Sequence, residues 1–359
     1  MEPLVIARAP GHITLGSIYA PFGTLAEAGE QLTLTAAVNY YAYAIITPSR
    51  AADVHISVAG NDSPGADELY GGAGWLGGSD LPRAIAELFG AGRGLSIFLT
   101  SQAPLGAGLG LSGSLTVSMI KALAFSCGLD LDAKEVAALA CYVRVDLLSL
   151  EGRDQCQYAA AYGGLNRIVT LNSSVRVDPF DLPIELQQSL EQHLMLFAAN
   201  GIPHASSQHS APARTPVEQA SSPTPTVPAG INRSVRTSLE IGDWTRLGAL
   251  LESTWLEQCR LAHVSQDDIL VAALKAAREC GALGGQGTRI NSGFLVVICP
   301  QEHQPGVTRA LAKQGLRRMP LALEPEGVQL LEAMPRPRLS SLPSEQDKHS
   351  IRSHLSGLR

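Results

Sequence analysis

One segment of the sequence has the spacing of an anion-binding loop. In APLGAGLGLSGSLTVSMIKAL (103–123), glycines at alternate positions are followed by two serines: Gly106, Gly108, Gly110, Ser112 and Ser114. Glycine allows backbone amides to turn toward a ligand, and the apolar spacing that follows predicts a helix whose first N–H groups are free. Because a helix N-terminus attracts negative charge, the segment predicts an anion site. A glycine-rich turn without a ligand is the alternative.

A second segment, EGRDQCQYAAAYGGLN (151–166), places charges before a small-residue helix that ends at a Gly-Gly pair. Cys156 would lie near the start of this helix, where the helix dipole favours a thiolate. A buried, unreactive cysteine is the alternative. Asp154 is either a catalytic carboxylate or a first-turn residue that interacts with the dipole.

Arg144 is a further candidate, because it lies between Val143 and Val145 and burying its guanidinium without a partner would be costly. Either an acidic neighbour pairs with it or it contacts a ligand anion, and the sequence leaves both open. The acidic neighbours are Asp146, Glu151 and Asp154.

The bulk composition excludes several classes of protein. Hydrophobic residues make up 45% and charged residues 17% of the 359 residues, which allows a large core and excludes global disorder. The net charge is −6 and no long basic run precedes the C-terminal tail, so nucleic acid is not expected as a partner. No apolar run is long enough to cross a bilayer, and no signal peptide is expected. The six cysteines lack metal-ligand spacing, which predicts free thiols in a reducing cytoplasm.

The apolar pattern predicts a mixture of strands and helices. Strands are expected at 4–7, 38–47, 95–100 and 294–299. Helices are expected from about Ser114, after Asp132, and at 244–259, 267–280 and 307–314. Asp132 and Glu135 have the spacing of a capping box, and the buried face of the helix that follows would be Val136, Leu139, Val143 and Leu147. The mixture predicts an α+β, two-layer architecture rather than a doubly wound sheet.

Two stretches have the composition of loops. Residues 202–234 are dense in Pro, Ser, Ala and Thr and predict a mobile loop that joins two folded halves. Residues 335–359 hold several Arg, Ser and Pro residues and predict a flexible, basic tail.

The glycine-rich segment resembles the second motif of the GHMP kinases, Pro-x-x-x-Gly-Leu-Gly-Ser-Ser, which cradles ATP phosphates. ARAPGHITL, at residues 7–15, resembles their first motif, and QYAAAYGGLN resembles a segment of the heptose-phosphate kinase and fucokinase-like branch. The likeness runs from about Ile6 to Leu331. It implies a two-lobed fold with an N-terminal lobe like ribosomal protein S5 (1–190) and a ferredoxin-like C-terminal lobe (191–334). The active site would lie between the lobes.

The same resemblance locates departures from the family. An ungapped match places Cys156 where the family has the carboxylate that orients the attacking hydroxyl, and Arg144 where it has a magnesium-binding Glu. A guanidinium repels a cation but binds an anion. His12 stands at the basic position of the first motif. The third motif, normally a run of glycines, reads GGQGTRINSGF, in which side chains interrupt the glycines at Arg289, Ile290, Asn291 and Ser292.

These departures predict a protein that is not a conventional kinase. The favoured hypothesis is an enzyme without metal or cofactor that stabilises loss of phosphate or sulfate from a small polar substrate, by elimination or ring closure. Its catalytic residues would be Cys156, Arg144, Asp154 and His12, and Arg289 and Asn291 would join the glycine loop in binding the anion. One alternative is an inactive pseudokinase that acts through a protein partner or as a homo-oligomer. The other is a genuine sugar or sugar-phosphate kinase that uses ATP and magnesium.

Overall fold

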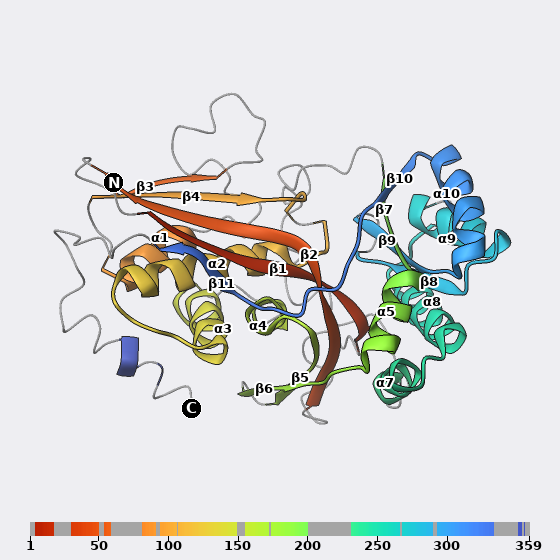
Figure 1. Cartoon of the computed structure of the whole chain (residues 1–359), viewed down its shortest axis with the longest axis horizontal. Helices are drawn as coiled ribbons and strands as arrows, with labels where there is room; N and C mark the ends of the chain where they lie inside the picture. Colours follow the sequence, from red (N-terminus) through yellow and green to blue (C-terminus); the bar gives the residue numbers. More distant parts are fainter. Residues whose placement is uncertain are drawn as a thin grey trace.

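Two β-sheets form the framework of the chain (Figure 1). The computed structural model describes residues 4–17, 30–49, 54–58, 81–90, 94–105, 107–148, 155–171, 174–199, 231–265, 268–289, 293–333, 351–353 and 355. The first sheet contains β1 (Val5–Ser17), β2 (Glu30–Pro48), β3 (His55–Val58), β4 (Leu95–Ser101), β5 (Leu165–Leu171), β6 (Ser174–Pro179) and β11 (Gln329–Ala333). The second contains β7 (Leu194–Ala199), β8 (Gly284–Gly287), β9 (Phe294–Ile298) and β10 (Leu316–Met319). The strand orders are β11-β1-β2-β4-β3, with β5 on β2 and β6 on β5, and β10-β7-β9-β8.

Helices pack on both sheets, which confirms the predicted α+β class. Those of the first sheet are α1 (Leu81–Leu88), α2 (Leu111–Ser126), α3 (Ala133–Tyr142) and α4 (Gln155–Tyr162). Those toward the second sheet are α5 (Ile184–His193), α8 (Trp244–Leu261), α9 (Ile269–Glu279) and α10 (Gln304–Lys313) (Figure 1). α7 (Ile231–Ile241) packs on α8 and on β1 and β2 of the first sheet. The expected helices at 244–259, 267–280 and 307–314 and the strands at 95–100 and 294–299 are confirmed to within a few residues. Among the described helices, none is long and apolar enough to span a membrane.

β1 and β2 are both much longer than the sequence predicted. β1 continues past Pro10 and Gly11 because its register against β2 shifts there, and a strand tolerates proline at such an irregularity. β2 is long because its two halves have different partners: β5 pairs with 30–36 and β4 pairs with 42–48.

α2 is buried on all sides, whereas the sequence predicted one apolar stripe. It begins at Leu111, earlier than the expected Ser114, and packs on β1, β2, α3 and α4. Two of its buried hydroxyls bond to carbonyls of the same helix. Thr116 Oγ1 donates to Ser112 O at 3.0 Å, and Ser126 Oγ donates to Ala122 O at 2.8 Å. These bonds satisfy the polar groups of a helix that lies in the core.

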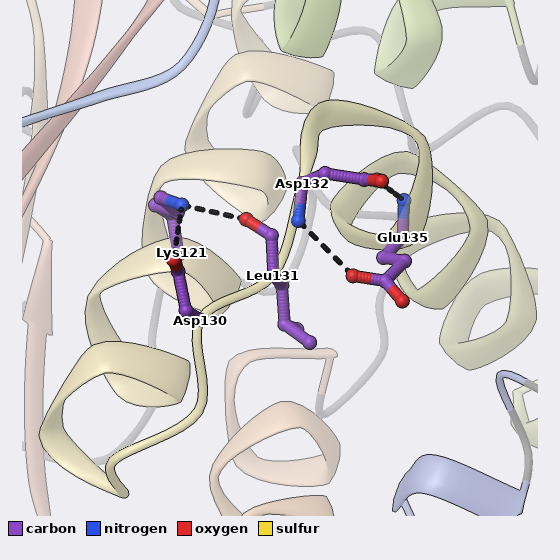
Figure 2. Close-up of polar contacts among 5 residues, drawn as sticks. All are labelled: Lys121, Asp130, Leu131, Asp132 and Glu135. Carbon is purple, nitrogen blue, oxygen red and sulfur yellow. Dashed lines mark hydrogen bonds and ion pairs between the residues drawn. The ribbon is translucent and has the colours of Figure 1, made fainter.

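The predicted capping box at the start of α3 is confirmed (Figure 2). Glu135 N donates to Asp132 Oδ1 at 2.8 Å, and Asp132 N donates to Glu135 Oε2 at 3.1 Å. Two N–H groups that would otherwise lack partners at the helix start are thereby satisfied.

The predicted buried face of this helix is wrong at its last position. Val136, Leu139 and Val143 are buried, but Leu147 is 46% exposed. The chain changes at Val143 into the π-helix η1 (Val143–Leu147), where Leu148 N donates to Val143 O. The wider turn rotates each later side chain away from the α-helical stripe, so Leu147 no longer faces the core.

Most of the expected mobile loop (202–234) lies outside the described residues, but its end does not. Residues 231–234 form the first turn of α7, in which Ile231 and Asn232 are buried. Asn232 Nδ2 donates to Leu32 O in β2 at 2.9 Å. The helical pattern of this turn was hidden by the Pro- and Ser-rich composition that precedes it.

The segment between β10 and β11 returns from the second sheet to the first. Tyr40 Oη donates to Pro320 O at 2.6 Å, and Ala322 N donates to Asn39 Oδ1 at 2.9 Å. β11 then pairs with β1. The extents of the lobes, 1–190 and 191–334, stay a prediction, with the correction that Gln329–Ala333 belongs to the first sheet.

Part of the expected basic tail is packed against the first core. Residues 334–350 lie outside the described part of the chain, but Ile351 is fully buried and Leu355 is 6% exposed. At these two positions the prediction of a flexible tail is wrong, because both apolar side chains belong to the hydrophobic core that the first sheet forms with α1, α2 and α3.

Tyr41 and Glu324 connect β2 to the returning segment. Tyr41 Oη donates to Glu324 Oε2, and Arg8 lies 4.3 Å from the centroid of the Tyr41 ring. Burial, followed by the hydrogen bond to the carboxylate, raises the pKa of Tyr41 to about 12. The neutral phenol is therefore the form that the fold stabilises.

The capping box gives a first prediction. Asp132→Ala should lower the free energy of unfolding by about 1 kcal/mol, because Glu135 N loses its acceptor. Asp130→Ala is the matched control: its fully exposed carboxylate pairs with Lys121 at 3.5 Å, and such surface pairs contribute little. Urea denaturation of both variants measures the difference, and equal losses would contradict the capping role.

The Tyr41 bond gives a prediction about pH. The folded-state pKa exceeds the ordinary value of 10.0, so the contribution to stability is complete below that pH and is lost as pH rises toward 12. Tyr41→Phe should cost about 1–2 kcal/mol at neutral pH, and the cost should shrink in alkaline solution. Tyr43→Phe is the control, since its ring lies beside Tyr41 with centroids 6.2 Å apart. A Tyr41→Phe cost that does not change with pH would contradict the assignment.

Candidate phosphate-binding site

The glycine loop ends at the uncapped N-terminus of α2. Gly110 is the N-cap residue, with φ of 69°, and no side chain caps the helix. The amides of Gly113 and Ser114 both donate to Gly110 O, at 2.9 and 3.2 Å. The amides of Leu111 and Ser112 come before these first helical hydrogen bonds in the chain. Amides at this position of a helix have no carbonyl partner within the helix, so they can bind an anion.

The first motif supports the loop from β1. His12 N donates to Leu109 O at 2.9 Å, and a Cβ atom at Gly110 would lie 2.1 Å from His12 Cε1. The His12 side chain is only 3% exposed. Ser114 Oγ donates to Pro10 O at 2.7 Å. His12 and Ser114 thus support the loop from β1, and the backbone amides at the start of α2 are the groups that could receive an anion.

The third motif approaches the loop from the second sheet. Thr288 follows β8, and its Oγ1 donates to Ala107 O at 2.8 Å. The glycines before it serve packing: a Cβ at Gly284 would lie 2.2 Å from Gly248 O of α8, and one at Gly287 would lie 2.6 Å from Trp255 Cζ2. Because these glycines lack side chains, β8 can pack directly against α8.

Cys156 lies beside the first turn of α2. It is half-buried in the first turn of α4, and a Cβ at Gly113 would lie 3.0 Å from Cys156 Cβ. The structure thus brings together Gly108, Gly110, Ser112, Ser114, His12 and Cys156 around one loop.

The other candidates are placed differently. Arg144 is half-buried in η1, which packs on α1 and α3. Its neighbours Val145 and Leu147 are 43% and 46% exposed, so the expectation of a guanidinium buried between apolar side chains is wrong. Arg289 follows Thr288 and is exposed. Gly106, Asp154 and Asn291 lie outside the described residues. Thr288 was missed; its signal was a hydroxyl directly after the glycines of the third motif.

A cation site built by the protein is not apparent in the described part of the chain. No group of three or more His, Cys, Asp and Glu side chains there could hold a metal ion.

Comparison with known proteins places this geometry in a family. Residues 80–164, which include the glycine loop and α2, match the model of the GHMP kinases N terminal domain. The chain is thus similar to the GHMP kinases in sequence over this segment and shares their fold over most of its length. This match confirms the resemblance found in the sequence.

The proteins to which this chain is similar are named as kinases. D-glycero-alpha-D-manno-heptose 7-phosphate kinase of Campylobacter jejuni is 26% identical over 222 residues, which cover 61% of this chain and 65% of the relative. The match thus spans slightly less than two thirds of that relative's own length. A D-glycero-D-manno-heptose 1-phosphate kinase from Bacteriodes thetaiotaomicron has a TM-score of 0.68 at 22% identity, covering 92% of this chain and 100% of that one. The L. major mevalonate kinase in complex with R-mevalonate has a TM-score of 0.61 at 18% identity, covering 89% and 96%.

These findings correct the functional hypothesis drawn from the sequence. Elimination or ring closure on a repurposed scaffold is contradicted, because the proteins to which the chain is similar are named as sugar-phosphate and other small-molecule kinases. A pseudokinase finds no support in them either. The substitutions at Cys156 and Arg144 were weighted too heavily against the uncapped start of α2 behind the glycine loop.

The contact between Gly110 and His12 gives a prediction about the site. Gly110→Ala combines a left-handed backbone with a steric overlap, so it should cost about 2 kcal/mol more than Gly94→Ala. Gly94 has a similar φ of 73°, but a Cβ there would meet only Ser49 O, at 3.5 Å. Chemical denaturation of both variants measures the difference. In the Gly110→Ala background, His12→Ala should cost less than in the wild type, because it removes the overlap; additive losses would contradict this account.

Proposed function

We propose that this protein is a kinase that transfers the γ-phosphoryl group of ATP to a hydroxyl of a sugar phosphate. The observation that carries the proposal is the uncapped start of the buried helix α2 behind a glycine turn, at the junction of the two sheets. In a fold shared with kinases, backbone amides at this place suit the phosphates of the donor nucleotide.

The chemistry asks mainly for positioning. Phosphoryl transfer passes through a loose transition state, in which the protein chiefly holds the phosphates and the acceptor in line. The bond between γ-phosphorus and ADP breaks as the acceptor oxygen bonds to phosphorus, and the hydroxyl proton leaves to solvent. Such a reaction depends less on a strong base than on geometry, so a thiol at Cys156 is compatible with it. Cys156, next to the start of α2, would line the acceptor side.

The residues present do not fit a magnesium site built from protein carboxylates. Arg144 stands where the resemblance would place a carboxylate ligand, and the described residues hold no acidic cluster. No step is therefore assigned to a protein-bound metal. Magnesium in kinase sites keeps several waters and binds substrate phosphates, so the ion would arrive with ATP as part of the substrate.

The acceptor we propose is a heptose phosphate. The support is that a heptose 7-phosphate kinase is among the sequence relatives and a heptose 1-phosphate kinase is among the structures that share the fold. Arg289, exposed at the edge of the loop, is proposed as a cation for a substrate phosphate.

The proposal is tested with MgATP and the two heptose phosphates, by following ADP release together with the phosphorus NMR spectrum of the product. Turnover is expected with at least one of the two. Ser112→Asp should raise the KM for MgATP by about 100-fold, because a carboxylate would occupy the start of α2 and repel the phosphates. The same carboxylate favours the helix, so the variant should remain folded.

Ser112→Asn is the matched control, since it has the same size as Asp without the charge. Its KM for MgATP should stay close to that of the wild type. Equal KM values for the Asp and Asn variants would contradict the proposal that a phosphate of ATP binds at the start of α2. Failure of the wild-type protein to phosphorylate either sugar would contradict the proposed acceptor.

A further inference from the structure

Thr288 connects the second sheet to the glycine loop through one hydroxyl group. Thr288 Oγ1 donates to Ala107 O at 2.8 Å and accepts from Phe294 N at 2.9 Å. Thr288 N donates in turn to Phe294 O at 2.8 Å. The hydroxyl thus uses its one proton on the loop and a lone pair on its own hairpin. A single side chain closes the turn between β8 and β9 and holds the loop.

The contact is closely packed on both sides. A Cβ atom at Gly108 would lie 2.5 Å from Thr288 Oγ1, and one at Gly293 would lie 2.6 Å from the same atom. Both glycines have positive φ, 96° and 99°. The Thr288 hydroxyl therefore occupies a space that exists only because both neighbours lack side chains.

The bond to Ala107 O also fixes a peptide plane. In a trans peptide the C=O of one residue and the N–H of the next point in opposite directions. Because Thr288 holds Ala107 O, the N–H of Gly108 must point away from Thr288. Among the described residues, no backbone carbonyl accepts a hydrogen bond from this N–H. It precedes the free amides at the start of α2 and can act with them.

We infer that Thr288 is a positioning residue, which aims the Gly108 N–H at a phosphate oxygen of the donor nucleotide. This inference rests on the proposed function and refines it. Thr288 itself does not touch the nucleotide. It sets the orientation of one donor of the glycine loop from the opposite sheet.

Steady-state kinetics of Thr288→Val provides the test. Val keeps the shape and removes the hydroxyl, so the KM for MgATP should rise about tenfold while kcat and the KM of the sugar phosphate stay within about twofold. Thr288→Ser should restore the KM for MgATP. A role in folding alone would lower the fraction of active enzyme and hence kcat, and would leave this KM unchanged.

Thr254→Val is the matched control. Thr254 Oγ1 donates to a backbone carbonyl within α8, that of Leu250, at 2.8 Å, so the variant loses the same type of bond outside the loop. Its KM for MgATP should equal that of the wild type. If Thr288→Val does not fold, Thr288→Cys replaces it, because a thiol is a weak donor and should raise this KM by a smaller factor. A wild-type KM in the Thr288→Val or Thr288→Cys enzyme overturns the inference.

Calorimetry with a non-hydrolysable ATP analogue and magnesium separates failure of the inference from failure of the proposed function. If no sugar phosphate is turned over but Thr288→Val still weakens analogue binding about tenfold, the acceptor is wrong and the role of Thr288 stands. If turnover occurs and analogue binding is unchanged by Thr288→Val, the proposed function is supported and the role of Thr288 is contradicted. A wild-type protein that binds no analogue overturns both.

Discussion

The rest of the structure depends on how closely the glycine loop is held between the two sheets. From β1, the His12 ring lies against Gly110, where a Cβ atom would come within 2.1 Å. From the β8–β9 turn, the Thr288 hydroxyl lies against Gly108, where a Cβ would come within 2.5 Å. Because these contacts use backbone and closely packed atoms, the loop has little freedom to relax. The glycine loop that leads into α2 is therefore supported by both sheets together.

This construction explains why the functional hypothesis drawn from the sequence was wrong. That hypothesis compared side chains, and it gave great weight to the thiol at Cys156 and the guanidinium at Arg144. The proposed phosphate site, however, relies on backbone amides and a helix dipole, and these do not change when a nearby side chain does. A transfer reaction that relies on positioning can tolerate such replacements better than one that relies on acid–base chemistry.

What could be predicted from the sequence was determined by local interactions. The capping box of Asp132 and Glu135 was predicted correctly because both partners lie in one helical turn. The return of β11 to β1 could not be predicted, since it pairs Val5 with Ala333 across almost the whole chain. The exposure of Leu147 was missed because a π-turn has no clear signature in one sequence. Within the site, the glycine spacing was informative, whereas the contact between Thr288 and Ala107 required knowing which segments meet.

The altered third motif shows how a glycine-rich segment can change its role without removing the site. Gly284 and Gly287 are needed against Gly248 and Trp255 of α8, so their small size serves the packing of the second lobe. Thr288, the residue after them, carries a hydroxyl that donates to Ala107 O. The side chains that interrupt the glycine run follow this contact in the chain, beginning at Arg289. The contact of Thr288 with Ala107 therefore supports the loop although the glycine run is interrupted after it.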